Sequence, residues 1–188
     1  MKRVLLIARR EFVGYFHGFY GWAILALMLM LDGLFFNAYT LGGVKSSSEV
    51  ISLFFYSNFG VTLAASVFVT MCSFAAEREQ RTLVLLQTSP ASDWEVVLGK
   101  YLGAYGFVQV TVLAALYMPL MVYFKGGLQW GQVASGYLGI LLCAGLSVAI
   151  GIFSSTLAPN QLLAGVIAGF LVTLQVLFWL LSGVTDAP

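Results

Sequence analysis

The sequence predicts an all-α membrane protein, a polytopic helical bundle of about five spans preceded by an interfacial helix. Of its 188 residues, 60% are hydrophobic and only 9% are charged, whereas soluble domains are about half apolar and about a quarter charged. The apolar residues are gathered in runs long enough for helical spans, which need roughly 20 residues each. Nine basic and eight acidic side chains could not cover the surface of a soluble globule, so that class is excluded.

The first expected element is an amphipathic helix over residues 1–18. At about 100° per residue, most of its apolar side chains gather on one face and its cations on the other. This pattern is typical of a helix in the membrane interface, with rings buried and cations near anionic headgroups. The candidate interfacial residues are Arg9, Arg10, Glu11, Phe12, Tyr15 and Phe16. A simple positively charged anchor is the alternative, and it would need no amphipathicity.

A transmembrane domain is expected over residues 19–183, followed by an outer-side tail at 184–188. Backbone groups in lipid must be paired within their own segment, so long apolar runs are expected to be helices. The five runs cover residues 19–41, 51–76, 100–124, 131–157 and 161–183.

The basic residues are unevenly distributed between the two sides of this topology. Seven of the nine lie before the first span, in the loop after the second or at the start of the third, which leaves Lys45 and Lys125 on the other side. Because basic residues favour the cytoplasmic side, we expect the N-terminus and this loop in the cytoplasm and the C-terminus outside.

The loop at residues 77–99 is expected to form a helix, a break and a second helix. Glu77 and Arg81 have the i,i+4 spacing that supports a helix, and a Ser-Pro pair ends it because the residue before proline avoids the α region. Ser92 and Glu95 match a capping box for the next helix. The first helix would carry leucines outside the membrane, and such an exposed apolar face suggests a protein partner.

The same loop resembles the signature loop of ABC-2 type transporter permeases. The shared pattern is an acidic-basic-acidic cluster, a threonine, a leucine-rich stretch, Ser-Pro and Gly-Lys. In this chain it is carried by Glu77, Arg78, Glu79, Arg81, Thr82, Leu83, Leu86, Ser89, Pro90, Gly99 and Lys100. The N-terminal segment around Arg9 to Phe16 is similar to that of gliding-motility (GldF-like) and nitrous-oxide-reductase-maturation (NosY-like) permeases.

The resemblance implies a membrane-spanning subunit of an ABC transporter in the bacterial inner membrane. In that family the loop is the coupling helix and contacts a separate ATPase subunit, so the nine loop residues from Glu77 to Pro90 named above are the candidate ATPase contacts. That subunit would hold ATP and Mg²⁺, and this chain would carry no catalytic motif, cofactor or metal. Two permease subunits, identical or different, would work in the lipid bilayer with two ATPase subunits and with any accessory periplasmic or membrane subunit; no nucleic acid is implied.

The resemblance also leaves two questions open. Family members usually have six spans, so a sixth is apparently missing here, as in a partial chain or a shortened variant. The alternative function is a non-transporting membrane scaffold or assembly factor of a gliding-type machinery, which would use the same loop to anchor a cytoplasmic partner.

Asp32 is the acidic residue that lies well inside an expected span. A charge at the centre of a bilayer costs about 2.5–3.5 kcal/mol on insertion scales, so it should face protein or a cavity. Asp32 would either line a translocation path or form a structural hydrogen bond with Asn37 or Asn58. Gln109 and Gln175 also lie within spans, where interhelical hydrogen bonds are the expected role.

Glycine and proline suggest how the spans pack and bend. Gly99-x-x-x-Gly103 and Gly165-x-x-x-Gly169 are small-residue motifs that permit close helix packing. Pro119 is expected to kink the third span.

Overall fold

The computed structural model describes residues 2–40, 46–81, 92–126 and 130–185, which form helices and no strands, as the sequence predicts. In chain order the helices are α1 (Lys2–His17), α2 (Phe19–Thr40), α3 (Ser47–Met71), α4 (Ala75–Glu79), α6 (Asp93–Ala114), α7 (Tyr117–Gly126), α8 (Trp130–Leu157) and α9 (Gln161–Thr185). Five helical segments in these ranges are long and apolar enough to cross a membrane. The predicted all-α bundle of five spans is therefore confirmed.

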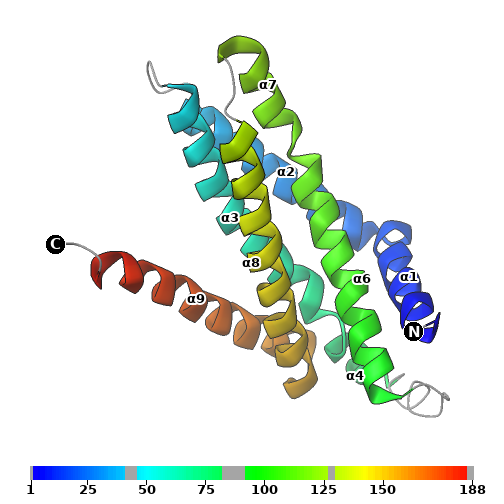
Figure 1. Ribbon diagram of the computed structural model, residues 1–188. Helices are drawn as coiled ribbons and strands as arrows, with labels where there is room; N and C mark the ends of the chain where they lie inside the picture. Colours follow the sequence, from blue (N-terminus) through cyan, green and yellow to red (C-terminus); the bar gives the residue numbers. More distant parts are fainter. Residues whose placement is uncertain (1, 41–45, 82–91, 127–129, 186–188) are drawn as a thin grey trace.

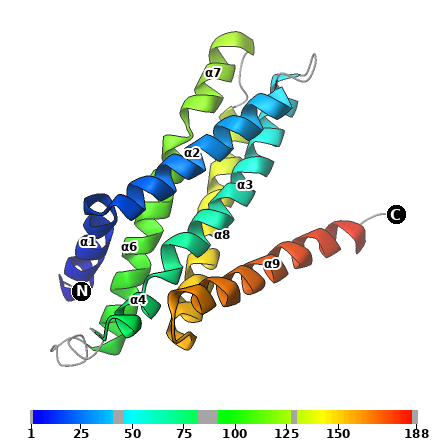
Figure 2. The same cartoon turned by 180° about the vertical axis from the view of Figure 1, so that it is seen from behind.

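The central helices of the bundle are α3, α6 and α8 (Figure 1). The view from behind shows α2 crossing the outer side of α3, and α1 lying along one end of α6 (Figure 2). The short helix α4 lies at the same end of the bundle as the N-terminus, which we call the α4 end. Helix α9 begins at this end and then diverges, so that its C-terminal end stands away from the other helices.

The main core lies where α3, α6 and α8 face one another. Val69, Phe107 and Val148 in this core have 0% exposure. Gly151 of α8 permits a very close approach, because a Cβ at this position would collide with the side chain of Thr70 on α3. Small residues serve this purpose in membrane bundles, where van der Waals packing rather than the hydrophobic effect drives association.

Helix α1 packs lengthwise on a glycine row of α6, formed by Gly99, Gly103 and Gly106. A Cβ at Gly103 would lie 2.6 Å from the Glu11 Cβ and 3.0 Å from the Ala8 carbonyl oxygen, so no side chain fits between the helices. The first small-residue motif of the sequence is therefore the surface on which α1 is seated.

Aromatic rings extend the contact between α1 and α6. Tyr15 stacks on Phe107 with a centroid distance of 4.8 Å, and Phe16 meets the same ring edge-on at 5.3 Å. Ile7 also packs against the core, whereas Leu5 is 65% exposed.

The second expected span is interrupted near its end. Helix α3 ends at Met71, and the chain starts again as α4 at Ala75 instead of continuing to residue 76 as one helix. The Ser155 hydroxyl of α8 accepts hydrogen bonds from the backbone N–H groups of Phe74 and Ala75, both at 2.9 Å. A side chain from another helix thus caps the new start and stabilises the break.

The third expected span is also divided, where the sequence predicted a kink. Helix α6 ends at Ala114 and α7 begins at Tyr117. A proline ring clashes with the carbonyl four residues before it, which here belongs to Ala115. The break removes this clash and places Pro119 in the first turn of α7, where N–H groups have no partner within the helix.

Candidate functional site

A buried lysine joins three helices at the α4 end of the bundle. Lys100 of α6 is only 2% exposed, and its Nζ lies 3.0 Å from Glu11 Oε1 of α1 and 2.8 Å from Glu77 Oε1 of α4. The same ammonium group donates to the Ser73 carbonyl at 3.0 Å and lies 5.1 Å from the centre of the Phe74 ring. These five residues form what we call the Lys100 cluster.

Local sequence features bring these groups together. The predicted capping box is present, with Ser92 and Glu95 each bonding the other's backbone N–H, and it starts α6 two turns before Lys100. The adjacent glycine row brings α1 close enough for Glu11 to reach the ammonium group. A buried lysine needs such partners, because an isolated charge of this kind would be strongly destabilising.

Arg78 fixes α4 to the connection between α8 and α9. Its Nη1 donates to the Ala158 carbonyl and its Nη2 to the Thr156 carbonyl, both at 2.9 Å. These carbonyls belong to the end of α8 and the turn after it, where a cationic side chain satisfies groups that have no partner within the helix. We call this contact the Arg78 clamp.

The predicted ATPase contacts are only partly within the described residues. Glu77, Arg78, Glu79 and Arg81 are described; Glu77 is half-buried, and Arg78, Glu79 and Arg81 are exposed. Five further candidates lie outside the described residues, namely Thr82, Leu83, Leu86, Ser89 and Pro90.

The expected helix through Arg81 is wrong. Helix α4 ends at Glu79, and Arg81 has a φ of 58°, which lies in the left-handed region. Glu77 therefore has no helical i,i+4 pairing with Arg81 and bonds to Lys100 instead. The i,i+4 rule is a local one, and here a contact between distant segments prevails over it.

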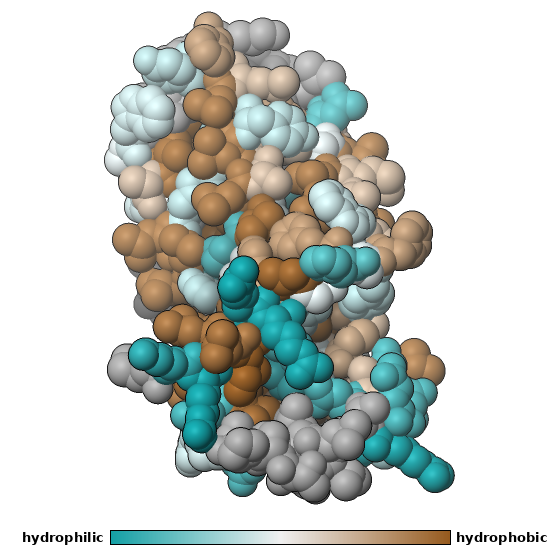
Figure 3. Space-filling view, turned by 90° about the vertical axis from the view of Figure 1, so that its right-hand side faces the viewer, coloured by the Kyte–Doolittle hydropathy of each residue, from teal (hydrophilic) through white to brown (hydrophobic). Residues whose placement is uncertain are grey.

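The candidate residues of α1 divide into two groups. Arg9 and Arg10 are exposed, and the face on which α1 and α6 lie shows hydrophilic side chains gathered in its lower half (Figure 3). Phe12, Tyr15 and Phe16 pack inward. The interfacial position of α1 stays a prediction.

The inward face of α1 also carries a charged residue, Glu11, that the sequence pattern did not assign to it. Glu11 joins the Lys100 cluster, and its spacing from Ala8, Phe12 and Tyr15 was the signal that it lies on the packed face. Burial raises the pKa of Tyr15, and the Glu11 carboxylate adds to the effect. The phenol therefore stays protonated and donates to the Val69 carbonyl at 3.3 Å.

Asp32 is buried in a second polar group, formed with Asn58 and Thr62. It is 4% exposed, and Asn58 Nδ2 donates to its Oδ2 at 3.2 Å, so Asn58 rather than Asn37 is its hydrogen-bond partner. Thr62 in turn donates to Asn58 at 3.5 Å. Within the described residues, Asp32 Oδ1 and the Tyr137 hydroxyl have no hydrogen-bond partner. A place for Asp32 in a translocation path stays a prediction.

The two intramembrane glutamines behave differently. Gln175 of α9 accepts a hydrogen bond from Ser147 of α8 at 3.2 Å, as expected. Neither amide atom of Gln109 has a hydrogen-bond partner among the residues that the structure describes, although both atoms are buried. The interhelical bond predicted for Gln109 is therefore not formed there.

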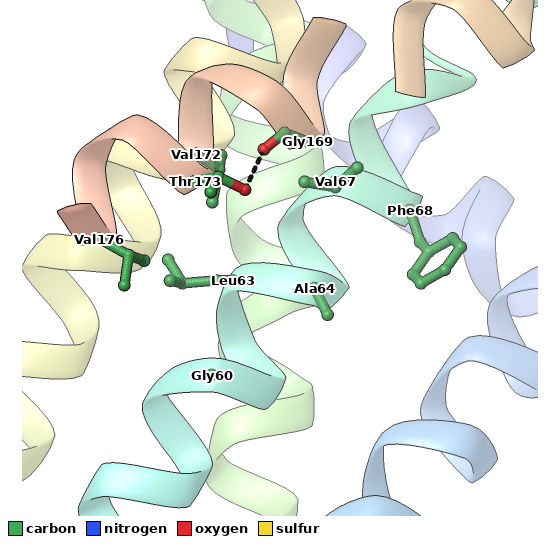
Figure 4. Close-up of a pocket in the computed structure, with 9 residues that line it drawn as sticks. All are labelled: Gly60, Leu63, Ala64, Val67, Phe68, Gly169, Val172, Thr173 and Val176. Atoms are coloured by element: carbon green, nitrogen blue, oxygen red, sulfur yellow. Dashed lines mark hydrogen bonds between the residues drawn. The ribbon is translucent and has the colours of Figure 1, made fainter. Parts of the chain in front are cut away.

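An apolar groove of about 440 Å³ separates α3 from α9. In Figure 4, Leu63 and Val176 point toward each other across it, and Thr173 bonds to the Gly169 carbonyl of its own helix. Gly169 has open space around it. In the second small-residue motif, only Gly165 is in contact with α3, where a Cβ would lie 3.3 Å from the Met71 sulfur.

The apolar spans and the charged contacts at one end define a polytopic α-helical membrane protein. The family model described as ABC-2 family transporter protein matches residues 59–187, more than half of the chain, and the chain therefore belongs to this family. It is a multi-pass permease component of an ABC transporter, a class that works with an ABC ATPase. No curated protein and no solved structure matches the chain.

Proposed function

We propose that this permease couples ATP hydrolysis by a separate ATPase subunit to export or other work across the membrane, and that the segment from α4 to α6 is the coupling element. The observation that carries the proposal is that α4 is anchored to the bundle by some of its charged side chains and exposes others. Glu77 and Arg78 anchor this helix to the bundle by their side-chain contacts, and the exposed side chains of Glu79, at its end, and Arg81, just after it, lie at the end of the molecule. Exposed charges on an anchored segment suit contact with a second subunit, because force applied there reaches the bundle.

The distribution of basic residues supports a cytoplasmic position for the α4 end. We infer an inner-membrane protein of a bacterium whose N-terminus lies in the cytoplasm, where ATP is available. Two permease subunits would pair with two ATPase subunits, and those would hold ATP and Mg²⁺. Assignment to the GldF-like or NosY-like group belongs to the proposal, while no observation favours the scaffold alternative.

Glu79→Ala and Arg81→Gln test the coupling assignment. Each change removes an exposed charge, so we expect stimulation of the partner ATPase by the permease to fall at least several-fold with normal membrane insertion. The measurement is ATP hydrolysis by the purified complex in lipid nanodiscs. Glu49→Ala is the matched control, because Glu49 is an exposed acid at the opposite end of the bundle. Normal stimulation in both test variants would contradict the assignment.

A further inference from the structure

Helix α4 is too short to hold its position by itself. It has five residues, and isolated helices shorter than about 12 residues are marginal in water. Contacts with other elements therefore fix it: the Ser155 hydroxyl at its N-terminus, Glu77 to Lys100, and Arg78 to Ala158 and Thr156. A displacement of α4 must either break these contacts or move the elements to which they lead.

The first set of contacts leads to α6 and α1. Glu77 and Glu11 hold the same ammonium group of Lys100 at 2.8 Å and 3.0 Å, and Lys100 is 2% exposed. Removing one partner from a buried ion pair is costly, since the remaining charge keeps its desolvation penalty. The glycine row also locks α1 against α6. These two helices are therefore expected to move together with Glu77.

The second set of contacts leads to α8 and α9. The Arg78 clamp holds carbonyls at the end of α8 and in the turn that precedes α9, whose first residue is Gln161. Cys72, next to α3, donates to the Gln161 side chain at 3.3 Å. Because α9 is attached at this end and diverges at the other (Figure 1), a small tilt at its start would move its far end further.

We propose that α4 is a branch point which transmits movement of the following loop through two separable arms, Lys100 to α1 and α6, and Arg78 to α8 and α9. This inference rests on the proposed function, since it assumes that an ATPase moves the loop. Lys100 and Arg78 are then positioning residues. The two arms share α4 but use different side chains and different target helices, so each can be removed alone.

The test uses the complete permease–ATPase complex in nanodiscs, with Cys72→Ser and Cys143→Ala to remove the native thiols. Spin labels at Leu6 and Met30 report on α1 relative to α2, and labels at Met30 and Phe170 report on α9 relative to α2. All three side chains are exposed, at 65%, 56% and 64%. Distances are measured by pulsed electron paramagnetic resonance without nucleotide and with ATP plus vanadate.

Two variants remove the arms one at a time. Glu11→Gln, Lys100→Met and Glu77→Gln together remove the Lys100 arm without leaving a buried charge. Arg78→Gln removes the clamp. Arg9→Gln is the control, because Arg9 is an exposed cation on α1 at the same end. Circular dichroism and size-exclusion profiles identify any variant that fails to fold; for Arg78, Arg78→Lys then provides a milder change that keeps the charge and loses the forked contact.

We expect nucleotide to shift both distances in the starting protein and in the control. The triple variant should lose the shift between Leu6 and Met30 and keep the one between Met30 and Phe170, and Arg78→Gln should show the reverse. Folded variants that keep both shifts, or that each lose both, would overturn the branch point while leaving the proposed function intact. Absence of both shifts in the starting protein would overturn the proposed function itself, and the branch point with it.

Discussion

The buried charge of Lys100 determines how substitutions of the residues around it change the stability of the protein. The Lys100 ammonium group lies between two carboxylates and forms an ion pair with each of them. Such a cluster contributes little net stability compared with an apolar replacement, yet the loss of one partner is expensive. A single substitution in this cluster is therefore expected to lower the free energy of unfolding much more than a combined substitution that removes all three charges.

Lys100→Met is expected to lower the free energy of unfolding by about 3–5 kcal/mol, because it leaves Glu11 and Glu77 without their shared cation. The triple variant that also carries Glu11→Gln and Glu77→Gln should recover most of this loss. Unfolding by sodium dodecyl sulfate in mixed micelles measures both. Equal destabilisation of the single and triple variants would show that the charges are not the cause.

Gln109→Met is expected to stabilise the protein by about 1–3 kcal/mol, since it removes a buried amide that has no hydrogen-bond partner among the described residues. Gln175→Met is the matched control and should be destabilising, because Gln175 accepts a hydrogen bond from Ser147. The same micelle titration compares the two. A loss of stability in Gln109→Met would contradict this prediction.

At the scale of elements, hydropathy was enough to predict the spans, and a local pattern was enough for the capping box at Ser92 and Glu95. The breaks were harder to foresee. The interruption before α4 depends on Ser155, which follows it by about 80 residues, and the one before α7 results from a clash that a kink could also have relieved. Sequence patterns report local preferences, whereas these boundaries depend on tertiary contacts.

The sequence indicated both surfaces that meet when α1 packs on α6. The amphipathic helix and the motif Gly99-x-x-x-Gly103 were recognised separately, but neither indicates its partner. The same holds for the Lys100 cluster. The sequence indicates that Glu77 is a charged residue in a helix, but only the packed structure shows that it pairs with Lys100 and not with Arg81. Local sequence patterns therefore identify the residues that form contacts more reliably than they identify the partners of those residues.

Gly103→Ala tests the α1 contact. A methyl group there would lie 2.6 Å from the Glu11 Cβ and close to the α1 backbone, and overpacking of this kind costs about 1–3 kcal/mol. The matched control is Gly139→Ala, because a Cβ at Gly139 meets nothing within 4 Å. In this control the better helix propensity of alanine should give up to about 1 kcal/mol of added stability. Similar stability changes in both variants would contradict a tight α1 contact.

At the scale of the whole molecule, the two ends of the bundle should face opposite sides of the membrane. In a background with Cys72→Ser and Cys143→Ala, we expect Ser48→Cys to react with a membrane-impermeant maleimide added to intact cells, because Ser48 is exposed at the end opposite α4. Asp93→Cys, exposed at the α4 end, should react only after the cells are opened. The reverse pattern would invert the proposed orientation.

The contact between α1 and α6 can form only some time after α1 has been synthesised. Ile7 lies against Gly99, so α1 packs on a segment that is made about 90 residues after it. At about 5–20 residues per second, α1 waits some 5–20 s for its partner, with Tyr15 and Phe16 lacking Phe107 and with Glu11 lacking Lys100. During this interval the membrane surface is the available partner for the amphipathic α1, and α1 can pack on α6 before α8 and α9 are made.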